Sequence, residues 1–272
     1  MTGGTEARHP ASMHLGEMSP EDVLALMASE DPRALHAVDR VQAELAEAAR
    51  RVAETFLAGG RTVLLGAGTP GRLAIQEVTE LPPTFGVPSE RFLALVASRA
   101  PVGPAGIAVT EDDTDGVTAA LRDFHIGSGD VVIGIASSGR TPFVLAGIRA
   151  AAEAGAWTSG IANNAGTPLL MAADLPILLD TGPELLTGST RLKAGTAQKI
   201  ALNRITTTAM VVAGRVRSNL MTELRGSNAK LRERAIDIVS TLTGIAHDRA
   251  EAILVSNDWH VGETLRRLER RD

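Results

Sequence analysis

Two short segments of this sequence combine glycines and hydroxyl side chains in a way that suits phosphate binding. The first is Gly66–Gly71 and the second is Ser137–Thr141, and each follows a short apolar run. Glycines let the backbone approach an anion, while hydroxyls and the amides of a helix N-terminus donate hydrogen bonds to it. We therefore expect a dianionic group to be held by Ser138, Gly139, Arg140 and Thr141, with Thr69 contributing from the first segment.

For either segment alone, an ordinary strand-to-helix turn with capping hydroxyls explains the pattern as well as a phosphate site does. Their occurrence at equivalent points of the chain favours the functional interpretation. The dinucleotide-binding fingerprint does not fit, because the first segment lacks the third glycine at the required spacing and no acid follows the next strand. A third segment, Thr187–Lys199, crowds hydroxyls and bases at a helix start, but its spacing alone favours a well-capped helix.

Composition excludes several classes of chemistry. The 272 residues include no cysteine, which excludes thiol catalysis, thiolate metal sites and disulfides. The net charge of −5 with interspersed signs, five Phe, two Trp and no Tyr argue against nucleic-acid binding. The histidines show no metal-ligand spacing. Without a signal-peptide pattern or a membrane-spanning run, the chain is expected to be a soluble cytoplasmic protein with neither metal nor other cofactor.

The elements that must position these segments alternate between strands and helices. Helical patterns over 72–81, 116–124 and 142–154 separate apolar runs that predict strands at Thr62–Leu65, Phe92–Ala97, Val131–Ala136, Thr158–Ala162 and Leu175–Leu179. Such alternation predicts right-handed crossovers and a mostly parallel sheet. We expect an α/β fold, a three-layer αβα sandwich on a five-stranded sheet. Ligands of such sheets bind beyond the carboxyl ends of the strands, where both glycine-rich segments fall.

Helices are expected at both ends of the chain. Ser19 and Pro20 predict the start of a first helix, and Asp31-Pro32 the start of a second that runs to Phe56. A long helix is predicted over Arg191–Ala213, followed by three or four short helices over 228–268. We divide the chain into an N-terminal helical segment (1–58), a phosphate-binding α/β domain (59–225) and a C-terminal helical module (226–272).

Several stretches together resemble the N-acetylmuramic acid 6-phosphate etherases, a branch of the sugar-isomerase-domain proteins. In order along the chain they are GAGTPGRLAI, TELPPTFGV, TED, GIASSGRTPFVLAGI, LLTGSTRLKAGTAQK and NLM followed by SNAKL. They extend from near residue 35 to near residue 235, and the N-terminal TEARHPAS is a degraded version of a family motif. GRTP and the TGS-x-R-x-KAGTAQK run are the most specific of these.

The resemblance implies a carbon–oxygen lyase that cleaves the lactyl ether of N-acetylmuramic acid 6-phosphate, an amino sugar recovered in peptidoglycan recycling. The products would be D-lactate and N-acetylglucosamine 6-phosphate. The family's two catalytic acids correspond to Glu80 and Glu111, and Ser189 and Lys193 would line the site. Two carboxyl groups with separated pKa values can perform the required proton transfers. The family is dimeric, so a homodimer is expected.

On its pattern alone, Glu80 is a solvated glutamate. Ile75, Val78 and Leu81 would face the core and leave Glu77 and Glu80 on the wetter side of the helix. Glu80 also lies roughly 16 Å along the helix from Thr69, too far for a hexose 6-phosphate to bridge both comfortably. We therefore expect the phosphate mainly on Ser138–Thr141, with Glu80 reaching in from the side or from a second subunit.

Glu111 lies in an acidic stretch that an exposed turn would explain equally well. Upstream of it the chain departs from the family, which usually has a Gly-Gly and an extra acid where this chain has Ser98-Arg99-Ala100-Pro101 and then Ala108. Two alternatives to the etherase therefore stay open. One is a non-catalytic regulator of the same fold that binds phosphosugars, and the other is an aldose–ketose isomerase of sugar phosphates.

Overall fold

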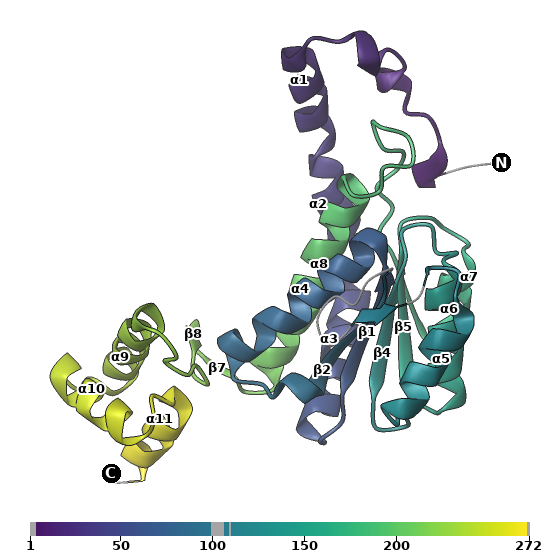
Figure 1. The fold of residues 1–272 in the computed structure, drawn as a ribbon. Helices are drawn as coiled ribbons and strands as arrows, with labels where there is room; N and C mark the ends of the chain where they lie inside the picture. The colour runs from purple at the N-terminus through teal and green to yellow at the C-terminus, as the bar shows by residue number, and fades with distance from the viewer. Residues whose placement is uncertain (1–3, 99–105, 109, 271–272) are drawn as a thin grey trace. The chain divides into compact units, whose positions relative to one another are not determined.

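A computed structural model describes residues 4–98, 106–108 and 110–270. The chain divides into two compact units. The first combines Met1–Val78 with Glu90–Ala209, and the second combines Thr79–Ser89 with Met210–Asp272. The first unit holds the large sheet, so most of the elements that position the glycine-rich segments belong to it (Figure 1).

The large sheet is parallel throughout, with the strand order β3-β2-β1-β4-β5-β6. Its strands are β1 (Thr62–Ala67), β2 (Phe92–Ser98), β3 (Gly106–Ala108), β4 (Val131–Ile135), β5 (Trp157–Ala162) and β6 (Leu175–Leu178). Strand order reverses between β1 and β4, which pair directly with Thr62 opposite Val131. This is the switch point at which open α/β sheets bind ligands, and both glycine-rich segments begin there.

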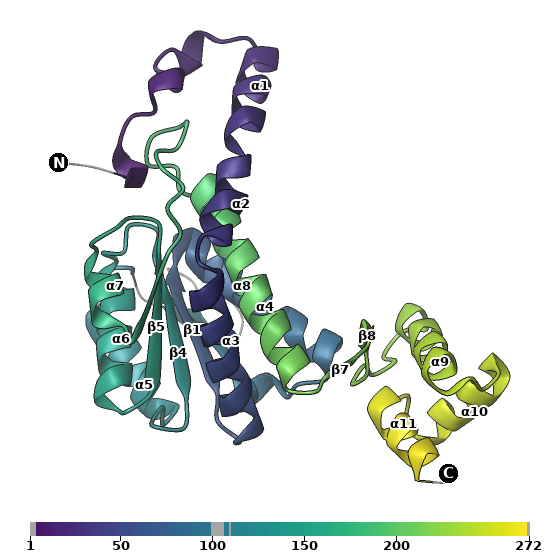
Figure 2. The same cartoon turned by 180° about the vertical axis from the view of Figure 1, so that it is seen from behind.

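Helices cover both faces of the sheet, which confirms the expected three-layer architecture. One face carries α5 (Thr114–Asp123), α6 (Pro142–Glu153) and α7 (Pro168–Ala172), and α3 (Gln42–Leu57) covers the other (Figure 2). Every residue of β1 and β4 is buried, as expected for strands covered on both sides. Leu65, Val132, Phe143 and Ile148 belong to the core under α5 and α6.

The remaining elements of the first unit run from the N-terminus and along the sheet. They are η1 (Gly4–Glu6), η2 (Pro10–Ser12), η3 (Leu15–Glu17), α1 (Pro20–Glu30), α2 (Pro32–Asp39), η4 (Ser89–Arg91) and most of α8 (Lys193–Val212). Ser19 caps α1 as expected, with its Oγ accepting a hydrogen bond from the amide of Asp22. α4 (Gly68–Phe85) begins in the first unit and ends in the second.

Three local expectations differ from the structure. The helix expected to run to Phe56 breaks at Arg40 and Val41, where the Arg40 guanidinium donates to the carbonyl of Asp180. A tertiary contact of this kind leaves no mark in helical periodicity. The first glycine-rich segment is already helical from Gly68, instead of from residue 72. The sheet also has a sixth, short strand, β3, which was not expected.

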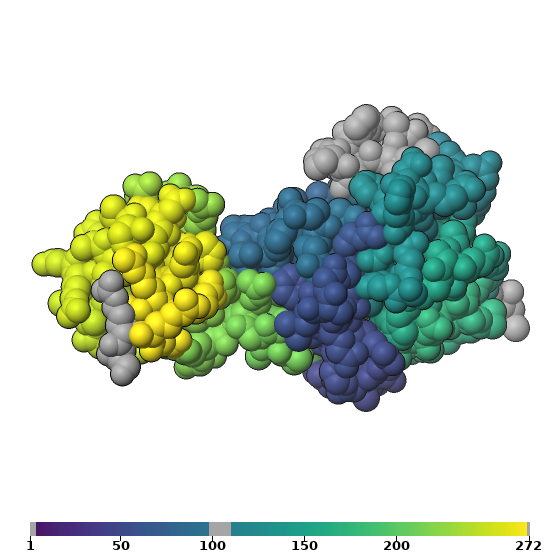
Figure 3. Space-filling model, turned by 90° about the horizontal axis from the view of Figure 1, so that it is seen from below, coloured from purple at the N-terminus to yellow at the C-terminus, as the bar shows by residue number. Residues whose placement is uncertain are grey.

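The second unit contains three helices around their own core. α9 (Ala229–Thr243), α10 (His247–Ser256) and α11 (Val261–Glu269) follow a small hairpin of β7 (Val216–Arg217) and β8 (Leu220–Met221). The C-terminal residues, yellow-green to yellow in Figure 3, form one group, and its buried core includes Leu224, Ile238, Val239, Leu254 and Leu265. Whether domain borders fall at 58 and 225 stays a prediction. Among the described residues, no helix is long and apolar enough to cross a membrane.

A buried ion pair joins the end of α1 to the start of α8. The Lys193 ammonium donates to Glu30 Oε2 and, at 2.8 Å, to the carbonyl of Pro183. His9 and Arg33 also approach the Glu30 carboxylate, at 3.2 and 2.9 Å. Burial opposes ionisation of Glu30, but the hydrogen bond from Lys193 and the surrounding positive charges lower its pKa below the ordinary value of 4.5.

Replacing Glu30 by Gln is expected to destabilise the protein most at neutral pH, because it leaves the buried Lys193 charge without its carboxylate. The free energy of unfolding should fall by about 3 kcal/mol at pH 7. A carboxyl with a lowered pKa contributes stability above its unfolded pKa and loses it as the pH falls. The difference from wild type should therefore shrink below about pH 4.5. Urea unfolding at pH 7 and at pH 4 measures this, with Glu21→Gln on the exposed side of α1 as control. Equal stability of Glu30→Gln and wild type at pH 7 would contradict it.

Candidate active site

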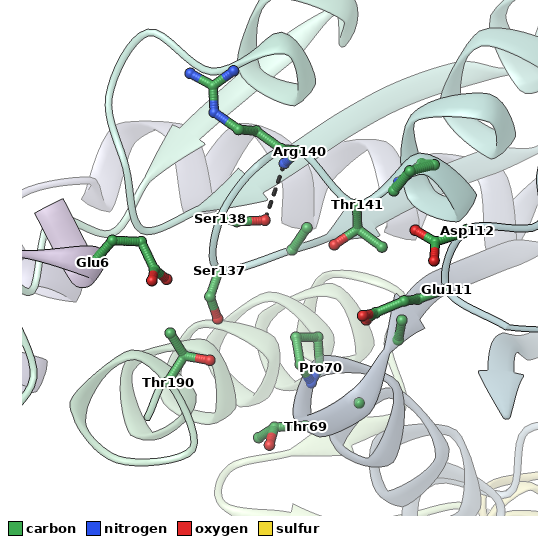
Figure 4. A pocket seen from close by; sticks show the side chains of 14 residues that line it. Glu6, Thr69, Pro70, Glu111, Asp112, Ser137, Ser138, Arg140, Thr141 and Thr190 are labelled. Carbon is green, nitrogen blue, oxygen red and sulfur yellow. Dashed lines mark hydrogen bonds between the residues drawn. The ribbon is translucent and has the colours of Figure 1, made fainter. Parts of the chain in front are cut away.

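A cavity of about 440 Å³ opens at the carboxyl ends of β1 and β4. Its walls come from both glycine-rich segments, from the turn before α5, from η1 and from the segment that precedes α8. Figure 4 shows the side chains of Glu6, Thr69, Glu111, Ser138, Thr141 and Thr190 around it. Its volume lies within the usual range for small-molecule sites, about 300–1,000 Å³.

The segment after β4 has the geometry expected of an anion site. Gly139 has a φ of +63°, and its amide donates to the carbonyl of Ala136 at 2.9 Å. A β-carbon on Gly139 would lie 2.2 Å from Thr167 Oγ1, so the turn requires glycine. Thr141 precedes α6 without capping it by a side-chain hydrogen bond. The positive end of α6 therefore faces the cavity beside the Ser138 hydroxyl, which suits a phosphate.

Two amide side chains, from the buried Gln198 and the partly buried Asn164, hold this loop in place. Gln198 Nε2 on α8 donates to Ser137 Oγ and to Asn163 Oδ1, both at 2.8 Å. Asn164 Nδ2 donates to the carbonyl of Ser137 at 2.8 Å. The sequence gives no local signal for these contacts, because their partners lie 27 to 61 residues apart.

The first glycine-rich segment has a different role from the second. A β-carbon on Gly66 would lie 2.7 Å from the amide nitrogen of Gly71, and one on Gly71 would lie 2.4 Å from Val96 Cγ1. These glycines therefore allow α4 to pack closely on the ends of β1 and β2. Thr69 nevertheless lines the cavity, where its side chain can contact a ligand.

Glu111 lines the cavity from the turn before α5. Its carbonyl accepts a hydrogen bond from the amide of Phe143, in the first turn of α6, at 3.0 Å. This bond ties the acidic turn to the helix that carries the phosphate loop. In Figure 4 the Glu111 carboxylate points into the cavity near Pro70 and Thr141. Asp113 caps α5 by accepting from the amides of Asp115 and Gly116. Within the acidic stretch, Asp113 thus caps a helix, whereas Glu111 and Asp112 line the cavity.

Other expected residues do not line this cavity. Glu80 is exposed near the end of α4, in a stretch that groups with the second unit. Ser189 is partly buried next to Thr190, which does line the cavity. Lys193 is 4% exposed and its ammonium is bonded to Glu30 and Pro183, so this geometry gives it a structural role. Arg99, Ala100 and Pro101, where the sequence departs from the family pattern, lie outside the described residues.

Two cavity residues were missed by sequence reasoning. Glu6 and Thr190 belong to irregular segments without periodicity, so hydrophobic pattern gives no indication of where their side chains lie. Thr190 at least lies in the hydroxyl-rich third segment, which was recognised as suited to an anion. Glu6 belongs to the N-terminal stretch whose motif was noticed but given no role.

Comparison with known proteins first identifies the fold. A family model described as the glucokinase regulatory protein N-terminal SIS domain matches residues 44–152. The solved structure of a phosphoheptose isomerase from Neisseria gonorrhoeae is 17% identical with a TM-score of 0.52, covering 72% of this chain and 100% of that one. The first unit therefore has the fold of the SIS class.

Relatives that are similar in sequence identify the family within this fold. The N-acetylmuramic acid 6-phosphate etherase of Pasteurella multocida is 44% identical over 254 residues, which cover 93% of this chain and 84% of that protein. The etherase of Deinococcus radiodurans is 44% identical over 250 residues, covering 92% and 82%. The chain belongs to the N-acetylmuramic acid 6-phosphate etherase family, which confirms the resemblance seen in its motifs.

Replacing Gly139 by Ala is expected to weaken phosphate binding, because the added β-carbon would collide with Thr167 and the backbone is left-handed. Gly166→Ala is a matched control, since Gly166 has a similar φ of +64° with open space around its Cα and is not among the residues that line the cavity. Calorimetric titration with a hexosamine 6-phosphate measures the effect. We expect affinity to fall at least about tenfold in Gly139→Ala. An equal loss in the two variants would show that backbone strain, and not the collision, is responsible.

Proposed function

We propose that this protein cleaves the D-lactyl ether of N-acetylmuramic acid 6-phosphate, giving N-acetylglucosamine 6-phosphate and D-lactate. One observation carries the proposal for this chain. A phosphate loop at the start of α6 and the carboxylate of Glu111 line the same cavity, and the Phe143–Glu111 backbone bond joins the segments that carry them. The 44% identity to etherases over 93% of the chain supports the substrate and the reaction.

In this proposal the phosphate anchors the sugar and takes no part in bond breaking. Ser138 and Thr141 donate hydroxyl hydrogen bonds to it, Gly139 gives the turn its left-handed geometry, and the dipole of α6 favours the negative charge of the phosphate. Arg140 adds a positive charge at the rim of the cavity. The binding energy of the phosphate positions the reacting carbons of the sugar next to the catalytic carboxylates.

The reaction then consists of an elimination followed by a hydration. In the ring-opened aldehyde, a carboxylate removes the proton on C2, the C3–O bond to lactate breaks, and a carboxylic acid protonates the departing lactate oxygen. Water adds at C3 of the unsaturated aldehyde, and a proton returns to C2. We assign these proton transfers to Glu111 and Glu80, and the chemistry calls for no metal or redox cofactor.

We further propose that the protein acts as a cytoplasmic homodimer. α1 supports this, because Leu24 is 66% exposed and Val23, Leu26 and Met27 are not fully buried in the single chain. Leu35 on α2 is also 49% exposed. A second copy would cover these apolar side chains. It would also let Glu80 act in a cavity other than that of its own chain, which the length of helix between Thr69 and Glu80 favours.

Glu111→Gln is expected to retain binding and lose turnover, because an amide cannot exchange the proton. D-Lactate release should fall at least about a hundredfold, while the affinity for the product sugar phosphate stays within about threefold.

Ser138→Ala should weaken the affinity for the product sugar phosphate, and Thr69→Ala should weaken it less. Binding by wild type without lactate release would favour a phosphosugar-sensing regulator, and formation of a ketose would favour an isomerase. A larger loss of affinity in Thr69→Ala than in Ser138→Ala would place the phosphate on the first segment.

Sedimentation equilibrium at micromolar concentration is expected to give twice the mass of the chain.

If Glu80 acts in the partner's cavity, mixed dimers of Glu80→Gln and Glu111→Gln chains contain one intact site. Random reassortment should then restore about a quarter of the wild-type lactate release. A monomer would refute the dimer, and no restoration on mixing would place both glutamates in one chain's site.

A further inference from the structure

The carboxylate of Glu6 lines the same cavity, although it comes from a short 3-10 helix at the N-terminus. Figure 4 shows Glu6 and Glu111 on opposite sides of Ser138. The anion site therefore lies between two carboxylates that belong to separate segments of the chain.

Glu6 is held in place by its neighbour Thr5, which is fully buried. The Thr5 amide donates to Asn164 Oδ1 at 2.9 Å, and Asn164 Nδ2 donates to Thr5 Oγ1 at 2.9 Å. Gly4 has a φ of +65°, and a β-carbon there would lie 1.7 Å from Asn164 Oδ1. Since Asn164 also donates to the carbonyl of Ser137, the same side chain positions Glu6 and the phosphate loop.

The loop before α8 leaves room for this carboxylate. The Gly188 amide donates to the carbonyl of Thr5 at 3.3 Å. A β-carbon on Gly188 would lie 3.2 Å from Glu6 Oε2, and its φ of +73° also favours glycine. Two segments far apart in sequence thus converge to place one carboxylate at the edge of the cavity.

The charge of Glu6 determines what it can recognise. A carboxylate accepts hydrogen bonds and repels a phosphate, so it cannot serve as a ligand for the dianion. Hydroxyl groups and amide N–H groups of a sugar are the donors that fit it. Glu6, Glu111 and Asp112 also outnumber Arg140 among the charged side chains that line the cavity, which disfavours ligands composed of anionic groups alone.

We propose that Glu6 is a specificity-determining residue that accepts a hydrogen bond from a hydroxyl or the acetamido N–H of the bound amino sugar. This inference rests on the proposed function of the cavity. Glu6 thereby favours a sugar phosphate over inorganic phosphate, since the carboxylate repels the dianion of both ligands but accepts hydrogen bonds only from the sugar.

The test compares Glu6→Ala and Glu6→Gln with wild type and with Glu17→Gln. Glu17 is an exposed glutamate in the neighbouring 3-10 helix η3, outside the cavity, and so is a matched control. KM and kcat are measured from D-lactate release, and inorganic phosphate is used as a competitive inhibitor. We expect Glu6→Ala to raise KM about tenfold or more with kcat within about threefold. Inhibition by phosphate should stay equal or strengthen.

Opposite movements of sugar and phosphate affinity support the specificity role. A parallel weakening of both would show that Glu6 merely orders the loop, and an unchanged KM would show that the sugar does not contact it. Either result overturns the inference, as does a fall in kcat with KM unchanged.

If wild type releases no lactate, the proposed reaction fails but the inference is still decided by binding. Calorimetric titrations with N-acetylglucosamine 6-phosphate and with inorganic phosphate then replace the kinetics. Glu6→Ala should weaken binding of the sugar phosphate and not that of phosphate. Equal effects on the two ligands would overturn it.

Discussion

The arrangement of the cavity depends on a small group of buried amide hydrogen bonds. Gln198 from α8 and Asn164 after β5 hold the side chain and the carbonyl of Ser137, which follows β4. Gln198 is fully buried, and a buried donor is costly when unpaired, so the network favours one position for the loop. Strand pairing brings β1 and β4 together, but this network sets where the Ser138 hydroxyl and the start of α6 lie. The anion site is therefore a product of tertiary contacts as much as of its own glycines.

The same contacts hold two carboxylates on either side of the Ser138 hydroxyl, where we propose that the phosphate binds. Glu6 is tied to the network through Thr5 and Asn164, and Glu111 is tied to α6 through the amide of Phe143. A remote anchor of this kind contributes binding energy without changing charge during the reaction. The carboxylates on either side are then available for hydrogen bonding or proton transfer. Phosphate binding and proton transfer would thus be performed by different residues, which is consistent with an elimination in which the phosphate does not react.

Sequence reasoning succeeded where a local pattern was enough. β1 and β4 are continuous apolar runs buried throughout, so both strands were placed correctly, although the first glycine-rich segment belongs to the end of β1 and the start of α4 and does not form a loop. Sequence reasoning failed where a residue is buried because of a partner that lies far away in the sequence. Glu77, expected on the wetter side of its helix, is 5% exposed because Lys199 and Thr206 from α8 bind its carboxylate. Helical periodicity carries no information about such partners.

The start of α8 shows why a helix N-terminus rich in hydroxyls and bases need not bind phosphate. Glu184 already accepts hydrogen bonds from the amides of Lys193 and Ala194, and burial raises its pKa although these bonds oppose the shift. The Lys193 ammonium is in turn committed to Glu30. A carboxylate thus occupies the place that an anion would take at α8, whereas α6 begins at Thr141 without a side-chain cap. The first turn of α6 has no such carboxylate cap, although the Phe143 amide is bonded to the Glu111 carbonyl, and a helix dipole favours a dianion there. We therefore propose that the phosphate binds at α6.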